Sequence, residues 1–287
     1  MVELLLAAGA NVHSLEGWPL QYASLNGHDV VVQQLLNAGA DVHANDDAAL
    51  RCAARHGHDA VIARLLAAGA NEQALVDGAL LKAVRSGDDE GVARLLAEGA
   101  NVHIDDDAAL HLAAKHGFNV VVALLLAAGA SVHADQDAAL RIAAEHNHDI
   151  VVAQLLTAGA DVHVCKNVAL RTAAVKGYDA IVARLLAAGA NAHQSEALRW
   201  AAEYGHAAVV AQLLAAGVDV NVKDPYSGQS ALLKAAENGH AVIVARLLAA
   251  GADAHAIEDE QLRWVAERGN PAIIEMVLAA RADAVAT

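Results

Sequence analysis

Residues 47–76 read DAALRCAARHGHDAVIARLLAAGANEQALV, and the same pattern begins again at Asp77. Its recurring parts are Ala-Leu-x-x-Ala-Ala, a short Gly-His turn, Val-Val/Ile-x-x-Leu-Leu and a closing Ala-Gly-Ala. A fixed period of this size is typical of stacked repeats rather than of separate globular domains. The closing glycines are spaced by 30 residues six times, then by 28 and by 34, at Gly9, Gly39, Gly69, Gly99, Gly129, Gly159, Gly189, Gly217 and Gly251.

Each repeat predicts two short helices. Leu50, Ala53 and Ala54 follow the i, i+3, i+4 spacing of one helical face, and residues 61–66 repeat that spacing for a second helix. Gly57 lies between them, where a left-handed residue would end the first helix. Helices of about nine or ten residues are shorter than the ~12–15 that a marginal isolated helix needs in water. We therefore expect the apolar stripes to be buried against neighbouring repeats.

The repeats resemble ankyrin repeats along essentially the whole chain. Gly-His stands at 27–28, 57–58, 205–206 and 239–240, and Gly-Ala-Asp-Val at 39–42 and 159–162. The resemblance implies an all-α solenoid of stacked helix-turn-helix units. The usual Thr-Pro-Leu-His is mostly replaced by Ala-Ala-Leu-Arg, and most repeats lose three residues before it, so we expect most β-hairpin fingers to be shortened to turns. Only residues 17–20 and 228–232 are similar to the usual form, and the longer connection at 219–231 predicts a real turn or finger. The thirty-residue form that closes in Val-His is similar to arrays encoded by giant viruses.

We interpret residues 1–287 as a single array. Residues 1–10 match the second half of a repeat and are interpreted as a partial repeat, either a fragment or internal start of a longer reading frame or a frayed end. About nine full repeats follow over 17–281, and 282–287 form a tail. Arg281 stands where a glycine belongs, and we expect the carboxyl end to fray there because arginine is costly in a left-handed cap.

Composition and charge limit the partners. The formal net charge is −15, which disfavours nucleic acid and anionic membranes. The acidic residues gather in the connections, as at 105–107, either as a solubilising shell or as a preference for a basic partner. Cys52 and Cys165 lie four repeats apart and cannot bond to each other, so two unpaired thiols predict a reducing, cytoplasmic location, which is the host cytoplasm if the protein is viral or a bacterial effector.

Sixteen histidines are unusually many, and seven occupy one slot in the connections. Stacked helices lie about 8–10 Å apart, so neighbours in this slot cannot share a zinc ion, whose ligands lie about 2 Å from the metal. We expect a structural role, in hydrogen bonds between adjacent connections. The seven are His13, His43, His103, His133, His163, His193 and His255, and Gln73 and Asn221 fill the slot elsewhere.

An arginine follows the leucine of the first helix in five repeats. We expect it to pair with carboxylates of nearby connections, the alternative being a track for phosphate or an acidic peptide. The five are Arg51, Arg141, Arg171, Arg199 and Arg263.

No catalytic pattern stands out, and we expect neither enzyme activity nor a cofactor nor a metal site. A phosphate-binding Gly-x-x-x-x-Gly-Lys-Ser/Thr motif and a zinc-binding His-Glu-x-x-His motif are both absent from the sequence. The pairs His56/His58 and His146/His148 each offer only two metal ligands. The segment that ends at Asn221 resembles the ankyrin segment modified by asparaginyl hydroxylases.

The two residues before each turn glycine vary most between repeats. In ankyrin arrays the matching positions line the concave groove, where partners usually dock, so the resemblance implies a partner-binding role for them. Tyr22, Trp200 and Trp264 share a different slot, which we interpret as core packing between repeats. Together with the aromatic anchors, the candidate partner-binding residues are Trp18, Arg55, His56, Arg85, Lys115, His116, Glu145, His146, Lys176, Glu203, Tyr204 and Tyr226.

Two functions remain open. The first is a non-catalytic scaffold that binds a protein partner, basic or host-derived among the options, through the groove and the tips of the connections. The second is a structural fragment whose exposed ends stack end to end into a weak homo-oligomer.

Overall fold

The computed structural model describes residues 11–12, 14, 17–192, 196–224, 227–267 and 270–286, and the side chains of these except 283–286. Within them the chain is helical, with one isolated antiparallel β-bridge, and no helix is long and apolar enough to cross a bilayer. The chain divides into two compact units after Ala134. The single array over 1–287 stays a prediction, and the partial repeat at 1–10 lies outside the described residues.

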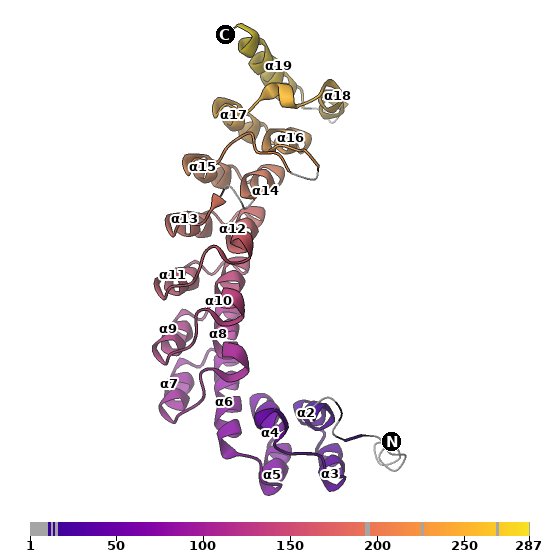
Figure 1. Cartoon of the computed structure of the whole chain (residues 1–287), viewed down its shortest axis with the longest axis vertical. Coiled ribbons are helices and arrows are strands. Elements are labelled where there is room, and N and C mark those ends of the chain that lie inside the picture. Colours follow the sequence, from indigo (N-terminus) through magenta and orange to yellow (C-terminus); the bar gives the residue numbers. More distant parts are fainter. Residues whose placement is uncertain are drawn as a thin grey trace. The chain divides into compact units, whose positions relative to one another are not determined.

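The first unit contains four helical hairpins, drawn indigo to magenta in Figure 1. Their first helices are α2 (Trp18–Leu25), α4 (Ala44–His56), α6 (Glu72–Ser86) and α8 (Ile104–His116). Their second helices are α3 (Asp29–Asn37), α5 (Asp59–Ala67), α7 (Asp89–Ala97) and α9 (Asn119–Ala127).

The second unit repeats the same hairpin. Its first helices are α10 (Ala134–Glu145), which begins at the boundary, α12 (Val164–Lys176), α14 (Ala197–Glu203), α16 (Ala231–Glu237) and α18 (Asp259–Glu267). Its second helices are α11 (Asp149–Thr157), α13 (Asp179–Ala187), α15 (Ala207–Ala215), α17 (Ala241–Ala249) and α19 (Pro271–Ala286), with a short 3-10 helix, η2 (Ala254–Ala256), before α18.

The helix boundaries follow the predicted signals. Gly57 has φ 74° where α4 ends, and Gly69 has φ 96° just after α5. Asn147 replaces the turn glycine in one repeat and also has positive φ, at 64°. Asp59 and Asp149 are the first residues of their helices, where the positive end of the helix dipole favours a carboxylate.

Within each unit, packing runs from repeat to repeat. First helices contact the next first helix, as α2 contacts α4 and α14 contacts α16. Most second helices do the same, as α3 contacts α5 and α13 contacts α15, and the exception among the described helices is α5 with α7. Leu50, Ala53 and Leu65 are fully buried by these contacts. The predicted all-α solenoid of stacked hairpins is confirmed.

The shortened connections form a left-handed turn. Asn45, Asp46 and Asp47 all have φ between 53° and 59°, and the right-handed helix follows at once. The same turn occurs at 105–107, 135–137 and 165–167. It replaces the finger and reverses the chain within three residues, and the short-polar asparagines and aspartates that fill most of its positions tolerate this conformation better than other residues do.

The last residue of this turn is a buried hydrogen-bond acceptor, so the acidic connections are not only a solubilising shell. The Oδ1 atom of Asp47 accepts a hydrogen bond from the backbone N–H of Asn71, 24 residues on in the next repeat, at 2.9 Å. Burial of a carboxylate requires such partners. The same bond joins Asp77 to Asn101, Asp107 to Ser131, Asp137 to Asp161 and Asn167 to Asn191, at 2.7 to 2.9 Å.

The histidines of the shared slot act within their own connection. The Nδ1 atom of His43 lies 3.1 Å from Asp47 and that of His103 lies 3.2 Å from Asp107. At these two positions the expected bond to the next connection is made by the buried aspartate instead of the ring. At Gln73 and Asn221, which fill the same slot, the expectation is confirmed, because their side-chain amides donate to the carbonyl oxygens of Gly99 and Gly251. His13 and His193 lie outside the described residues.

The longer connection contains the predicted hairpin. Lys223 and Ser230 form the antiparallel bridge, and the backbone N–H of Asp224 donates to the carbonyl oxygen of Gln229 at 2.9 Å. In this repeat Asn221 makes the bond that the buried aspartate makes elsewhere: its Oδ1 accepts a hydrogen bond from the backbone N–H of Asp253 at 2.8 Å.

The predicted fraying at Arg281 is wrong. The helix α19 continues past this residue to Ala286, so Arg281 never takes the left-handed conformation. Its guanidinium instead donates to the carbonyl oxygen of Ala254 at 3.1 Å and to Asp259 at 2.9 Å. The arginine thus ties the last helix to the connection before it.

Candidate protein-binding surface

The variable positions form what we call the variable row: the two residues that precede each turn glycine, or Asn147 in its place, at the carboxyl ends of the first helices. Arg55 and His56 are half-buried, whereas Arg85 is exposed. Basic residues at a helix carboxyl end also interact favourably with the helix dipole. The other predicted members in the row are Lys115, His116, Glu145, His146, Lys176 and Tyr204, which are exposed, and Glu203, which is half-buried.

Successive members of the row contact each other within each unit. In the first, an Nη1 hydrogen of Arg85 points at Nε2 of His56 across 3.4 Å. In the second, Nζ of Lys176 donates to the carbonyl oxygen of Glu145 at 2.9 Å and lies 3.6 Å from its carboxylate. In each unit, therefore, at least one pair of successive repeats brings its row members into direct contact.

Arg55 is a half-buried cation in this row. Burial, followed by the neighbouring charge of Arg85, lowers the pKa of its guanidinium, which remains charged at neutral pH. Its Nε atom is buried and has no hydrogen-bond partner among the described residues. A buried N–H group without an acceptor is unfavourable. Arg55 and Arg85 therefore form a cationic stretch in a chain that is otherwise acidic.

Exposed aromatic side chains accompany the row. Tyr204 is 52% exposed and stacks on Trp200, with the ring centroids 6.0 Å apart. Trp18 is equally exposed and stacks on Tyr22 at 5.0 Å. Such rings provide much of the binding energy at protein interfaces. The other predicted anchor, Tyr226, lies outside the described residues.

The assignment of Tyr22, Trp200 and Trp264 to the core is wrong. Tyr22 is 51% and Trp264 39% exposed, and Trp200 is half-buried beneath the guanidinium of Arg199, which lies 4.3 Å above its ring. Their slot lies at the edge of the first helices, because the alanine-lined contact between helices leaves no room for a large ring. The sequence did contain a sign that this position is exposed, because Lys82 occupies it in another repeat.

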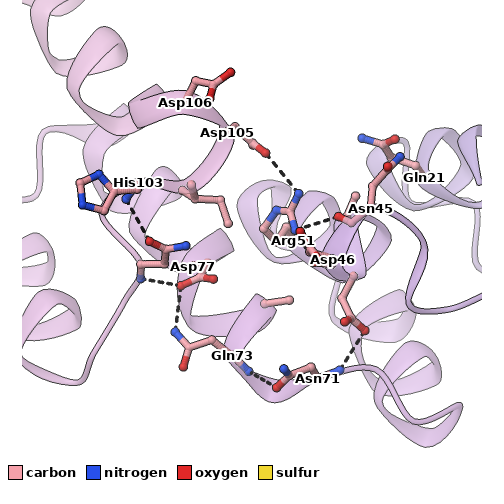
Figure 2. Close-up of a pocket in the computed structure, with 15 residues that line it drawn as sticks. Gln21, Asn45, Asp46, Arg51, Asn71, Gln73, Asp77, His103, Asp105 and Asp106 are labelled. Carbon is pink, nitrogen blue, oxygen red and sulfur yellow. Dashed lines mark hydrogen bonds and ion pairs between the residues drawn. The ribbon is translucent and has the colours of Figure 1, made fainter. Parts of the chain in front are cut away.

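A polar pocket of about 710 Å³ lies in the first unit among the connections of three successive repeats. Figure 2 shows its lining, from Gln21 of α2 to the turn that contains Asp105 and Asp106. Asp77 is held by the backbone N–H of Asn101, so it is an internal acceptor rather than a ligand-binding group. The sequence analysis did not single out this pocket.

Three of the arginines that follow the leucine pair with carboxylates, as predicted. Arg51 lies 3.2 Å from Asp105 across the pocket in Figure 2 and also donates to the carbonyl oxygen of Asn45. Arg141 lies 3.6 Å from Asp135. The third pair is Arg199 with Asp224, at 3.2 Å.

The histidine pairs offer little to a metal. His56 and His58 are stacked, and each directs a ring nitrogen to a backbone carbonyl oxygen, of Cys52 and Leu25 respectively. The described residues contain no group of three or more histidine, cysteine, aspartate or glutamate side chains that could hold a metal ion.

Comparison with known proteins identifies the family. The profile for ankyrin repeats in groups of three matches residues 1–75, 80–166, 151–224, 170–258 and 198–287. The structure is similar to the human ASB11 ankyrin repeat domain, with a TM-score of 0.59 and 23% identity over 70% of this chain and 96% of that one. It is also similar to the ankyrin repeat domain of Bcl-3, a member of the IkappaB protein family, with a TM-score of 0.59 and 29% identity over 69% and 97% of the two chains. A search among curated proteins returned no match.

The chain belongs to the ankyrin repeat family. Ankyrin repeat domains are in general protein–protein interaction modules, and they are typically non-catalytic.

Proposed function

We propose that this chain binds a protein partner, without catalysis, through the variable row. The observation that supports this most directly is the contrast between constant helices and changing row: Ala53 and Ala54 recur in almost every repeat, whereas the residues after them differ each time. A surface held by packed helices loses little conformational freedom on binding. Tyr204 and Trp18 supply aromatic anchors.

The row of the first unit fits an acidic segment of the partner. Arg55, Arg85 and Lys115 follow one another on α4, α6 and α8, and Arg55 has a buried Nε without an acceptor. A carboxylate of the partner would instead pair with the exposed guanidinium of Arg85 in a charge-assisted hydrogen bond. Complementary charges of this kind give specificity and a faster association rate.

A basic partner, which the net charge of −15 favours, would use other residues. The exposed carboxylates of Asp46, Asp105 and Asp106 lie at the pocket, outside the row itself, although Asp105 interacts electrostatically with Arg55. A basic or host-derived partner and a cytoplasmic location stay expectations from the sequence.

The test is selection of peptides from a random displayed library by the purified chain. Three proteins are compared: the wild type, the row variant Arg55→Gln/Arg85→Gln/Lys115→Gln, and the control Ala63→Glu/Ala93→Glu/Ala123→Glu, which alters exposed positions on the second helices. Both variants change the net charge equally. We expect acidic peptides to be enriched, the row variant to bind them at least about tenfold more weakly, and the control to bind as the wild type does. Peptides that bind the row variant unchanged would remove the row from the interface.

End-to-end stacking is the alternative and has a separate measurement. Light scattering over a range of concentrations reports the mass of the particles in solution. A mass that rises equally in the wild type and in the row variant would favour stacking, and a constant monomer mass would count against it.

A further inference from the structure

The second helices α5 and α7 depart from the packing seen elsewhere in the first unit. They belong to successive repeats, yet they barely touch, whereas α3 packs on α5 and α7 packs on α9. The side chains that should meet there, Ile62 and Leu95, are only half-buried, although their counterparts Val122 and Leu125 are fully buried. The stack is therefore open between α5 and α7.

An ion pair that the sequence provides for this junction is not formed. At two other junctions an arginine pairs with the aspartate 35 residues before it: Arg64 with Asp29, at 2.6 Å between Nη2 and Oδ2, and Arg184 with Asp149, at 2.7 Å. The α5–α7 junction carries the matching pair, Asp59 and Arg94. The Arg94 side chain is 71% exposed, and the ion pair that it makes in the described structure is a loose one with Glu98 at 3.9 Å.

On the opposite side of the same junction, an ion pair skips a repeat. Arg51 of the α4–α5 repeat lies 3.2 Å from Asp105, which belongs to the connection before α8, 54 residues on. Stacked helices lie about 8–10 Å apart, so groups two repeats apart in a straight stack are separated by about twice that distance. The Arg51–Asp105 contact therefore requires a bend that brings these two connections together.

The repeat in between has the residues that permit this bend. Its first helix, α6, is right-handed from Glu72 to Ser86. The left-handed turn of the neighbouring repeats is therefore missing between the connection of Arg51 and that of Asp105. Gly78 replaces the usual alanine and lets α6 approach α4 closely: a Cβ at this position would lie 2.6 Å from the Cβ of Ala54 and 2.6 Å from the carbonyl oxygen of Arg51. On the α5 side, Gly91 replaces the valine that packs on the previous helix in most repeats.

We propose that the α6–α7 repeat is a hinge with two positions. In the bent position, which the structure shows, Arg51 pairs with Asp105 and α5 stands away from α7. In the straight position Arg94 pairs with Asp59, as Arg64 does with Asp29, and Ile62 and Leu95 become buried. Straightening breaks the Arg51–Asp105 pair and opens the pocket between the connections. The exchange loses an ion pair whose arginine is buried and gains an exposed one, and the burial of Ile62 and Leu95 offsets that loss. The hinge does not depend on the identity of any partner.

The test measures the distance between spin labels on the second helices. The labelled pair is Ala67→Cys with Ala97→Cys, and the control pair Thr157→Cys with Ala187→Cys occupies the matching exposed positions on α11 and α13, which do pack. The native thiols are replaced by Cys52→Thr, a residue that Thr172 shows to be accepted in that slot, and by Cys165→Ser.

We expect the 67–97 distance to be longer than the 157–187 distance in the otherwise unchanged chain. Asp105→Ala should add a population at the control distance, Asp59→Ala in the same chain should remove that population, and Asp106→Ala, in the same turn, should change nothing. A 67–97 distance equal to the control from the start would disprove the bend. A single long distance that Asp105→Ala leaves unchanged, in a chain whose circular dichroism is normal, would disprove the second position.

Discussion

The Oδ1 atom of Asp77 lies 2.7 Å from the backbone nitrogen of Asn101, although Asp77 sits in a straight right-handed helix and not in a left-handed turn. The left-handed turn places Asp107 in the same relation to Ser131, at 2.8 Å. Two different backbone paths thus deliver an acceptor to the same amide of the next repeat. The constant feature is a hydrogen-bond acceptor for this backbone N–H, whereas the backbone conformation of the connection differs between repeats.

Removal of this acceptor should destabilise the first unit. Asp107→Ala removes the acceptor of the N–H of the half-buried Ser131. An unpaired buried N–H typically costs about 1–3 kcal/mol, so we expect a loss toward the lower end of that range. Asp107→Asn should be much milder, because Asn167 already accepts the same bond from Asn191 at 2.8 Å. Urea unfolding followed by circular dichroism measures the difference. The exposed neighbour, Asp106→Ala, is the control, and an equal loss in both alanine variants would contradict the role of the buried acceptor.

The helices of this fold were predictable because their signals are local. The spacing of Leu50, Ala53 and Ala54 defines a buried face wherever it occurs, and Gly57 marks the turn with a conformation that few residues adopt. Neither inference requires knowledge of what lies beside the helix. The outcome confirms the repeat and its two-helix organisation within each unit.

The buried aspartates were missed because an acidic run such as 105–107 resembles a solvated loop. Only the last residue of the run, Asp107, is buried, and its partner is a backbone amide that composition does not reveal. The signal was positional: an aspartate or asparagine stands directly before the Ala-Ala-Leu motif or its variants in five successive repeats. These are Asp47, Asp77, Asp107, Asp137 and Asn167.

The candidate surface was predictable in its location but not in its charge pattern. The positions of Arg55 and Arg85 followed from their variation between repeats, and the structure places them at neighbouring helix ends. Their mutual electrostatic effect depends on how closely α4 and α6 approach, which Gly78 controls. A single glycine in a regular helix gives no indication of this from the sequence alone.

The ion pair between α11 and α13 should make stability depend on acid. The hydrogen bond from Arg184 holds the pKa of the Asp149 carboxyl below its ordinary value of 3.8. Because the folded pKa is lower than the unfolded one, the pair stabilises the fold above about pH 4, and this contribution is lost as the pH falls through the folded pKa. We expect Asp149→Asn to be less stable than the wild type at pH 6, and the difference to shrink as the pH falls below about 4.

Thermal unfolding at a series of pH values measures this convergence. Asp179→Asn is the matched control, because Asp179 begins the next second helix but has Gln212 rather than an arginine at the matching position, 33 residues on across the shorter connection. Parallel curves for the wild type and Asp149→Asn from pH 6 to pH 3 would show that the pair does not contribute.

The close approach of α6 to α4 predicts the sign of a conservative change. Alanine favours a helix over glycine by about 1 kcal/mol, so Gly78→Ala would stabilise an open site. Here the new Cβ would lie 2.6 Å from the backbone carbonyl oxygen of Arg51, which cannot move aside as a flexible side chain could. We expect a loss of about 1–3 kcal/mol, typical of overpacking, in urea unfolding. A gain in stability would mean that α6 and α4 are not in this contact in solution.

Placing the residues of other repeats at positions 88 and 91 should favour the straight position of the hinge. In three other repeats a histidine after the turn glycine bonds to a carbonyl oxygen of the previous repeat, as Nε2 of His206 does to Val175 at 2.9 Å. Asp88 stands at this position in the hinge repeat, and its carboxylate caps α7 by accepting from the N–H of Gly91 at 2.9 Å. A Cβ at Gly91 would lie 2.2 Å from that carboxylate, so the aspartate and the glycine form a coupled pair.

The double variant Asp88→His/Gly91→Val should therefore straighten the hinge. The histidine can reach the carbonyl oxygen of Arg55, and the valine can pack on α5 where Gly91 leaves space. With spin labels at positions 67 and 97, we expect the distance to fall to that of the 157–187 pair. Gly91→Val alone should lose the cap, at a cost of about 1 kcal/mol, without straightening the chain. If the double variant keeps a normal helix content and the long distance, the departures in this repeat are not what holds it bent.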